Sequence, residues 1–167
     1  MRKFICMLLA LEPILFVCGA AHSEPTNSML AFYVVSDQKI EGGRFVDTPD
    51  MPKLGYIAAE PDLVVTNLQE VFPDKDRQIV IVPDKDHPIA PSDLPQYLAV
   101  RLRLSDAKPF IDLTERSAGK QMLVMLGGRP LTSWHGVGRF PEGRFDISFQ
   151  NGADLKKTED DLKKLIR

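Results

Sequence analysis

The sequence predicts an α+β protein whose C-terminal part forms an antiparallel sheet. Three observations over residues 97–167 support this class. Several segments have the apolar patterning of strands, and two others carry an apolar stripe with the period of a helix. A glycine pair between two apolar segments indicates a hairpin. The order of these elements is that of a ferredoxin-like, split β-α-β sheet with both helices on one face.

The first of these elements is a half-buried strand at residues 97–104, because apolar and other side chains alternate there. The face expected to be buried holds Leu98, Val100, Leu102 and Leu104, and the opposite face holds Ala99, Arg101 and Arg103.

A helix is expected next, with Ser105 as its N-cap and Pro109 in its first turn, where proline is tolerated. Gly119 stands where a glycine commonly ends a helix. The apolar stripe consists of Phe110, Leu113, Thr114 and Ser117, widened by Ile111.

A hairpin follows this helix. Residues 121–126 form a nearly continuous apolar run, which is typical of a central strand. Gly127 and Gly128 suit a two-residue turn that needs positive φ angles. Residues 130–134 are the returning strand, with Pro130 near its start or on a sheet edge.

The chain closes with a strand at residues 144–149 and a helix capped by Thr158. The acidic residues 159–161 would occupy the first turn of this helix and the basic residues 163–167 its end, an order that suits the helix dipole. Leu162, Leu165 and Ile166 form its apolar face.

Residues 24–96 are expected to form an irregular, strand-containing N-terminal extension. Residues 29–35 predict a strand, residues 63–71 a strand or short helix, and residues 78–82 a strand. Glycine and proline punctuate residues 37–61, which predicts an irregular segment with short extended pieces. The tetrapeptide Pro-Asp-Lys-Asp at 73–76 and 83–86 favours turns over a calcium loop, because the spacing of a calcium ladder is missing.

Residues 1–23 have the layout of a secretory signal peptide, with a basic start, an apolar run and small residues before Glu24. We therefore expect a periplasmic protein. The alternative is a membrane-anchored protein facing the periplasm, through lipid on Cys18 or an uncleaved signal. Both cysteines, Cys6 and Cys18, lie in this segment, so the mature chain would contain no disulfide.

The remaining motifs favour scaffold roles. Gly119 and Lys120 follow a helix and precede a strand, which is the reverse of a phosphate loop. The net charge of −2 gives no basic surface for nucleic acid. Only His87 and His135 would remain after signal removal, so we expect neither a metal site nor a cofactor. A serine hydrolase using Ser133, His135 and Asp146 is the less favoured alternative.

Residues 98–167 resemble the head of the first periplasmic domain of SecD, a protein-export membrane subunit. The matching pattern is Phe110, Leu113, Thr114, Gly119, Lys120, an apolar strand, Leu126, Gly128 and Ser133, followed by a threonine-led acidic helix at residue 158. The sequence departs from it at Ser117, where the family has Asn, at Gly127, where it has Asp, and at Trp134 and His135, where it has Ala-Pro.

The resemblance implies a non-enzymatic binding or accessory domain that contacts unfolded polypeptide, or envelope and export proteins. No series of apolar spans that could form a SecD membrane motor is found, so we expect a free-standing copy of the head domain. A structural domain of an envelope assembly is the other alternative. Trp134 and His135 are the candidate ligand-binding residues, at the end of a strand that can offer a free sheet edge.

Overall fold

The computed structural model of this protein describes residues 29–49, 51–75, 94–150 and 152–167. The expected signal peptide with Cys6 and Cys18, the strand expected at 78–82, the second Pro-Asp-Lys-Asp and His87 lie outside these residues. Within the described part of the chain, no helix is long and apolar enough to cross a membrane.

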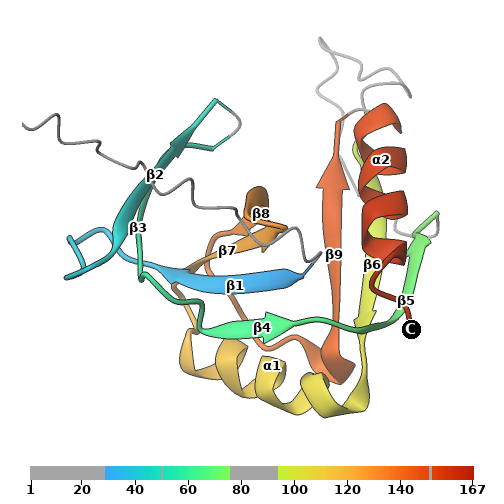
Figure 1. Ribbon diagram of the computed structural model, residues 1–167, viewed down its shortest axis with the longest axis horizontal. Helices are drawn as coiled ribbons and strands as arrows, with labels where there is room; N and C mark the ends of the chain where they lie inside the picture. Colours follow the sequence, from blue (N-terminus) through green and yellow to red (C-terminus); the bar gives the residue numbers. More distant parts are fainter. Residues whose placement is uncertain (1–28, 50, 76–93, 151) are drawn as a thin grey trace, which may run out of the picture.

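A four-stranded antiparallel sheet lies at the centre of the fold, in the order β4-β1-β7-β8 (Figure 1). Its strands are β1 (Leu30–Val35), β4 (Leu63–Val65), β7 (Gln121–Leu126) and β8 (Arg129–Trp134). The two middle strands are buried on both faces: Phe32 and Val124 belong to one core cluster, Tyr33 and Leu123 to another. Burial on both faces explains why residues 30–35 and 121–126 are continuous apolar runs. The central strand predicted at residues 121–126 is confirmed.

A second, three-stranded antiparallel sheet has the order β5-β6-β9. It consists of β5 (Leu68–Pro73), β6 (Gln96–Leu102) and β9 (Arg144–Phe149). Leu98, Val100 and Leu102 point into the core beside Phe145 and Ile147. The predicted alternation of faces is therefore confirmed up to Leu102, but Ala99 on the opposite face is also fully buried, so the strand is not half-buried at that position.

A hairpin of β2 (Arg44–Thr48) and β3 (Met51–Ile57) packs on the face of the four-stranded sheet that carries Tyr33 and Leu123. It is joined to that sheet by two backbone hydrogen bonds between Ser36 and Tyr56, of 2.8 and 2.9 Å. Residues 37–61, expected to form an irregular segment with short extended pieces, thus contain a two-stranded hairpin. Pro52 and Gly55 lie within β3. The two strands tolerate them because their pairing is irregular between Val46 and Thr48.

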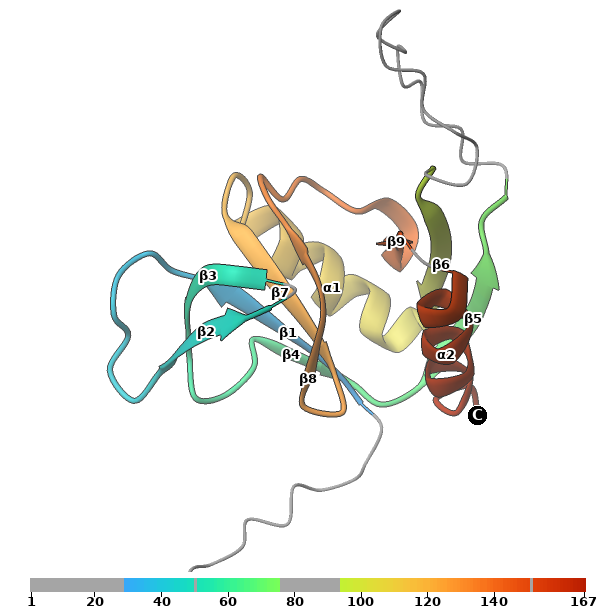
Figure 2. The same cartoon turned by 90° about the horizontal axis from the view of Figure 1, so that it is seen from above.

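Helix α1 (Leu104–Arg116) packs against β4, β6 and the short 3-10 helix η2 (Pro141–Gly143), and helix α2 (Gly152–Lys163) packs against β5, β6 and β9 (Figures 1 and 2). The predicted stripe of α1 is confirmed, because its members are buried: Phe110 0%, Leu113 1%, Thr114 0% and Ser117 2% exposed. Gly119 adopts the expected positive φ, 76°, shortly after the helix ends.

Both helices begin earlier than predicted. In α1 the N-cap is Arg103, which makes no side-chain capping bond, so Ser105 lies inside the helix and Pro109 beyond its first turn. Leu104 is 90% exposed, because the chain turns into the helix before the strand alternation can bury it. In α2 the helix begins at Gly152, so Thr158 lies in its middle and caps nothing.

The α+β class and the antiparallel pairing are confirmed, but the strands are divided between two sheets. Strands β6 and β7, which flank α1, belong to different sheets. The segment before residue 97 supplies β1 and β4 to one sheet and β5 to the other. It also reaches the C-terminus, because the Leu68 amide donates a 2.9 Å hydrogen bond to the Leu165 carbonyl. Both parts of the chain therefore contribute to one core.

The hairpin turn between β7 and β8 provides a first testable prediction. Gly127 and Gly128 have φ angles of 55° and 81°, and a Cβ at Gly127 would meet nothing within 4 Å. Replacing both by valine should therefore destabilise the fold through backbone strain, by roughly 1 kcal/mol or more per position. Chemical denaturation measures this. Gly138→Val is the control, because a Cβ at Gly138 would also meet nothing within 4 Å and Gly138 has no positive φ. Equal losses of stability per position in the two variants would contradict the claim that positive φ causes the loss.

Candidate functional site

Strand β8 is the edge of the four-stranded sheet as far as the structure describes the chain, with β7 as its partner. The register between the two shifts between Val124 and Met125, which leaves Leu131 without a direct partner. Pro130 near the start of the strand is confirmed, and an edge strand is where proline is tolerated. An edge strand presents backbone N–H and C=O groups that another chain can pair with.

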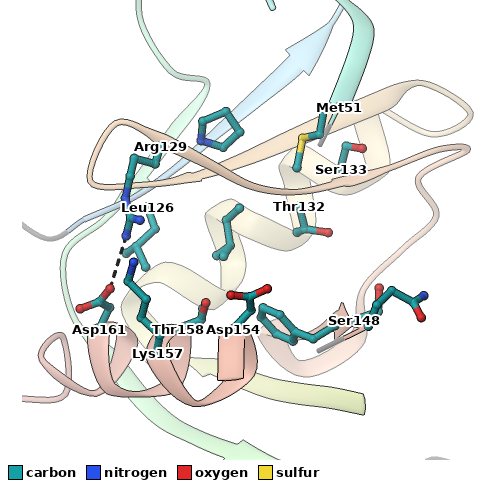
Figure 3. Close-up of a pocket in the computed structure, with 14 residues that line it drawn as sticks. Met51, Leu126, Arg129, Thr132, Ser133, Ser148, Asp154, Lys157, Thr158 and Asp161 are labelled. Carbon is teal, nitrogen blue, oxygen red and sulfur yellow. Dashed lines mark hydrogen bonds and ion pairs between the residues drawn. The ribbon is translucent and has the colours of Figure 1, made fainter. Parts of the chain in front are cut away.

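A cleft of about 520 Å³ opens along this edge between β8, the end of β9 and one face of α2 (Figure 3). Leu126, Leu131 and Phe149 supply its apolar surface, and Arg129, Thr132 and Ser133 line its β8 side. The α2 side consists of Asp154, Lys157, Thr158 and Asp161. Their i, i+3, i+4, i+7 spacing places all four on one face of the helix.

The cleft carries both signs of charge. The Arg129 guanidinium is 3.3 Å from the Asp161 carboxylate, which joins β8 to α2 at one end of the cleft. A 2.6 Å hydrogen bond from Lys164, helped by the charges of Lys164, Arg129 and Lys157, holds the pKa of Asp161 below its usual value against the opposing effect of burial. Asp161 is therefore ionised at neutral pH and holds Arg129 in place.

A second cavity, of about 220 Å³, lies between β3 and the far end of β8. Residues 51–54 of β3, which include Lys53, line one side of it, and Gln121, Ser133 and His135 line the other. Met51 and Ser133 also line the large cleft, so the two cavities meet at the β8 edge.

Trp134, a candidate ligand residue, ends β8 and is partly buried. Its indole packs 4.9 Å from Phe140 and 5.3 Å from Phe145, measured between ring centroids, and also contacts Phe32 and Phe110. Trp134 and Phe140 line a further cavity of about 410 Å³. The indole is thus mainly part of the aromatic core, with one part facing a cavity.

His135, the other candidate, is exposed, and its Nε2 lies 3.2 Å from the side-chain nitrogen of Gln121. His135 and Ser133 share the 220 Å³ cavity, whereas Asp146 lines the 410 Å³ cavity with His135 and Trp134. The structure therefore brings Ser133 and His135 together but places Asp146 in a different cavity from Ser133.

Gly119 and Lys120 have the scaffold role that the sequence predicted. They lie between α1 and β7, and their backbones exchange hydrogen bonds of 2.9 and 3.0 Å with Val137. Among the described residues, no group of three or more His, Asp or Glu side chains is arranged to hold a metal ion.

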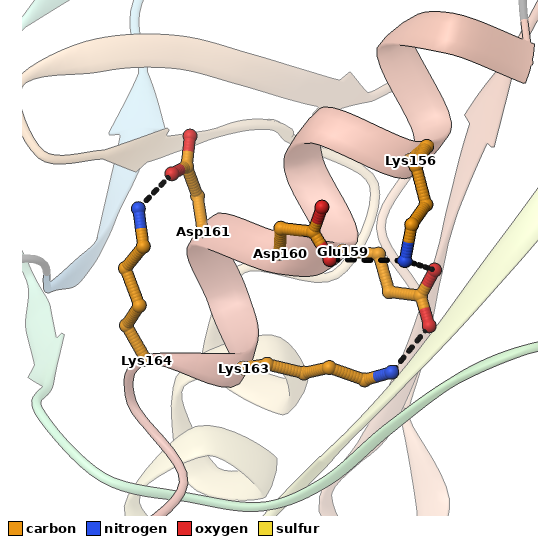
Figure 4. A network of polar contacts seen from close by, with 6 residues as sticks. All are labelled: Lys156, Glu159, Asp160, Asp161, Lys163 and Lys164. Atoms are coloured by element: carbon orange, nitrogen blue, oxygen red, sulfur yellow. Dashed lines mark hydrogen bonds and ion pairs between the residues drawn. The ribbon is translucent and has the colours of Figure 1, made fainter.

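The α2 face of the cleft was not among the site residues predicted from the sequence. Residues 158–161 had been interpreted as a helix cap and an acidic first turn, whereas Asp154, Lys157, Thr158 and Asp161 line the cleft. Their helical spacing is visible in the sequence once the helix is taken to begin at Gly152. The charged residues on its other faces form pairs instead, such as Lys156–Asp160 at 3.0 Å and Lys163–Glu159 at 2.6 Å (Figure 4).

Glu159 provides a prediction of pH dependence. The carboxylate is buried and accepts a hydrogen bond from Lys163, which with the charges of Lys163 and Lys156 holds its pKa below the usual value despite burial. Its stabilising contribution is thus present above the usual carboxyl pKa and is lost as pH falls through the lower folded pKa. Glu159→Gln should lower the free energy of unfolding at pH 7 by about 1 kcal/mol.

The difference between Glu159→Gln and the unchanged protein should shrink as the pH falls below about 4.3. Denaturation at several pH values measures it. Asp112→Asn is the matched control, because Asp112 forms an exposed helical pair with Lys108 at 2.8 Å. Such pairs contribute about 0.5 kcal/mol or less. A Glu159→Gln deficit that stays constant across this range would contradict the assigned ion pair.

Comparison with known proteins gives a structural similarity and no sequence match. No protein-family model matches the chain, and no curated protein matches it. A solved structure of SecDF, described as a membrane component that enhances protein export, superposes with a TM-score of 0.54 at 14% identity. The match covers 83% of this chain and 63% of the SecDF chain. A second SecDF structure, in a super-membrane-facing form, gives 0.49 at 16% identity over 82% of this chain and 18% of that one. The fold of this chain is therefore similar to that of part of SecDF.

Proposed function

We propose that this protein is an exported, non-enzymatic accessory domain that binds extended polypeptide in the periplasm along the edge of β8. The observation that carries the proposal is the 520 Å³ cleft that runs beside this edge strand. An incoming chain can pair its backbone with β8 whatever its side chains are, so the binding would tolerate many sequences. We also propose that the domain takes part in protein export, because its fold is similar to that of part of SecDF.

The chemistry of the cleft supports weak and reversible binding. Its apolar surface is divided among Leu126, Leu131 and Phe149, and its α2 wall is polar. A ligand there gains main-chain hydrogen bonds and modest apolar contact, and it loses the conformational freedom of an unfolded chain. Such a balance suits a domain that holds a passing polypeptide briefly.

Backbone amide NMR shifts of the full chain, recorded during titration with a reduced, permanently unfolded polypeptide, test the proposal. We expect shifts in β8 and on the α2 face that contains Asp154 and Lys157, because both line the cleft. The internal control is β5, at an edge of the other sheet. The chemical shifts of its amides should not change. Shifts that are absent, or that appear in β5 and not in β8, would refute this mode of binding.

A hydrolase is the second candidate, because Ser133 and His135 line one cavity. Mass spectrometry of the polypeptide after long incubation separates the two functions. Intact polypeptide is the result expected for a binding domain. Cleavage that disappears in Ser133→Ala would establish the hydrolase instead.

A further inference from the structure

The cavity of about 410 Å³ beyond the end of β8 combines aromatic rings with charged side chains. The rings are those of Trp134, Phe140 and Phe145. The charged side chains are those of Glu142, Arg144 and Asp146, and residues 135–138, which include His135, complete the lining. Aromatic faces and carboxylates both attract cations, so the balance of charge in this lining decides what the cavity can hold.

Arg144 supplies the positive charge of the lining, and it is already engaged. Its guanidinium donates a hydrogen bond to Asp74 and lies 3.6 Å from a carboxylate oxygen of Asp146. It also lies over the ring of Phe72, 5.6 Å from the ring centroid. With Glu142 there are thus three carboxylates against one guanidinium at this place. The excess of negative charge favours a ligand with a positive group.

Glu142 is the carboxylate that faces such a ligand. Among the residues that the structure describes, it forms no ion pair, and it is exposed beside the cavity. Its backbone is left-handed, with φ 60° and ψ 14°, a conformation that strains a residue other than glycine. The next residue, Gly143, packs so closely on α1 that an added Cβ would lie 2.6 Å from the Cβ of Ala107. Neither ion pairing nor backbone preference therefore accounts for a glutamate here, whereas a cationic ligand would.

The cavity and the cleft beside α2 follow one another along two strands. On β8, Ser133 lines the cleft and the next residue, Trp134, lines the cavity. On β9, Asp146 lines the cavity and Ser148 lines the cleft. Residues i and i+2 of a strand lie on the same face, about 6.8 Å apart. A polypeptide that pairs with the β8 edge in the cleft therefore reaches the cavity within a few residues.

We propose that this cavity takes one basic side chain, arginine above all, from a polypeptide held at the β8 edge. The stem of the side chain would lie against Phe140 and the accessible part of Trp134, and its charge would face Glu142. A planar guanidinium suits both walls, because it stacks on aromatic rings and pairs with carboxylates. The inference rests on the proposed function and adds to it a residue that the preferred ligand contains.

Two synthetic peptides test the selection. Both are labelled segments of serine, threonine and valine, and they carry near each end either arginine or citrulline, which is similar in shape and has no charge. Either direction of pairing with β8 then brings one such residue to the cavity. Fluorescence anisotropy with the full chain should show the arginine peptide binding roughly threefold to tenfold more tightly. Equal affinities would overturn the basic site while leaving polypeptide binding intact, whereas binding of neither peptide would overturn both proposals.

Trp134 reports on the cavity directly, because it is the single tryptophan of the chain and lines this cavity. At saturation, the unlabelled arginine peptide should change the tryptophan emission more than the citrulline peptide does. Identical emission with the two saturating peptides would place the arginine elsewhere and overturn the assignment to this cavity.

A charge removal tests the role of Glu142. Glu142→Gln keeps the size of the side chain and should weaken binding of the arginine peptide about twofold to fivefold, as expected for an exposed ion pair. Binding of the citrulline peptide should not change. Glu41→Gln is the matched control, because Glu41 is exposed in the turn before β2 and does not line the cavity. Equal weakening by the two variants would show that only net charge matters and would overturn the assignment to Glu142.

Discussion

Replacing Phe110 by alanine is expected to lower the free energy of unfolding by about 3–5 kcal/mol. Phe110 is fully buried on α1, and its ring centroid lies 5.1 Å from that of Phe32 and 5.6 Å from those of Phe140 and Phe145. These rings come from the four-stranded sheet, the loop before β9 and β9 itself. Truncation would open a cavity where α1 and both sheets meet, and the surrounding strands cannot close it without losing their own pairing.

Chemical denaturation followed by circular dichroism measures this loss. The matched control is Phe45→Ala, because Phe45 is 48% exposed on the hairpin and contacts only Tyr56 among the aromatic rings described. That control should change stability by less than half as much as Phe110→Ala. A loss at Phe110 no larger than the loss at Phe45 would show that the aromatic cluster does not hold the two sheets together.

The elements that could be predicted from the sequence are those with local signals. The glycine pair at 127–128 specifies its turn by requiring positive φ, and the stripe of α1 follows from the helical period. The edge position of Pro130 follows from its missing N–H. Each of these features depends on neighbouring residues alone, so one segment of sequence suffices to predict it.

The division into two sheets could not be predicted in the same way. Alternation shows which face of a strand is buried, but it does not name the partner strand. Strand β6 reads as half-buried whether it pairs with β7 or, as found, with β5 and β9. Strand β1 pairs with β7 across a long stretch of sequence, and nothing within residues 30–35 specifies that choice.

The residues of the candidate site could likewise be predicted only where a local signal marks them. Trp134 and His135 were predicted from their position at a strand end, and Trp134 is indeed the last residue of β8, with His135 directly after it. The opposing residues of α2 became visible only with the sheets in place, because β8 and α2 meet through tertiary packing. Arg129 and Asp161, which join them, are far apart in sequence and carry no shared motif.

Replacing Trp134 by alanine is the second change with a large expected effect, a loss of about 3 kcal/mol in the free energy of unfolding. The indole contacts four phenylalanine rings and is only partly buried, which places the loss at the lower end of the range for a large aromatic residue. His135→Ala is the control, because His135 is exposed and its contact with Gln121 is on the surface. A surface change of this kind is expected to alter stability by about 0.5 kcal/mol or less.

The same two variants separate packing from ligand binding. If Trp134 mainly packs, Trp134→Ala lowers the unfolding midpoint, and its folded fraction still binds an unfolded polypeptide with nearly unchanged affinity. If the indole anchors the ligand, the affinity of that folded fraction falls tenfold or more, since truncation of a central aromatic anchor costs about 2 kcal/mol. The contacts with four core rings favour the first result. Titration well below the unfolding midpoint decides between them, because only folded protein is then compared.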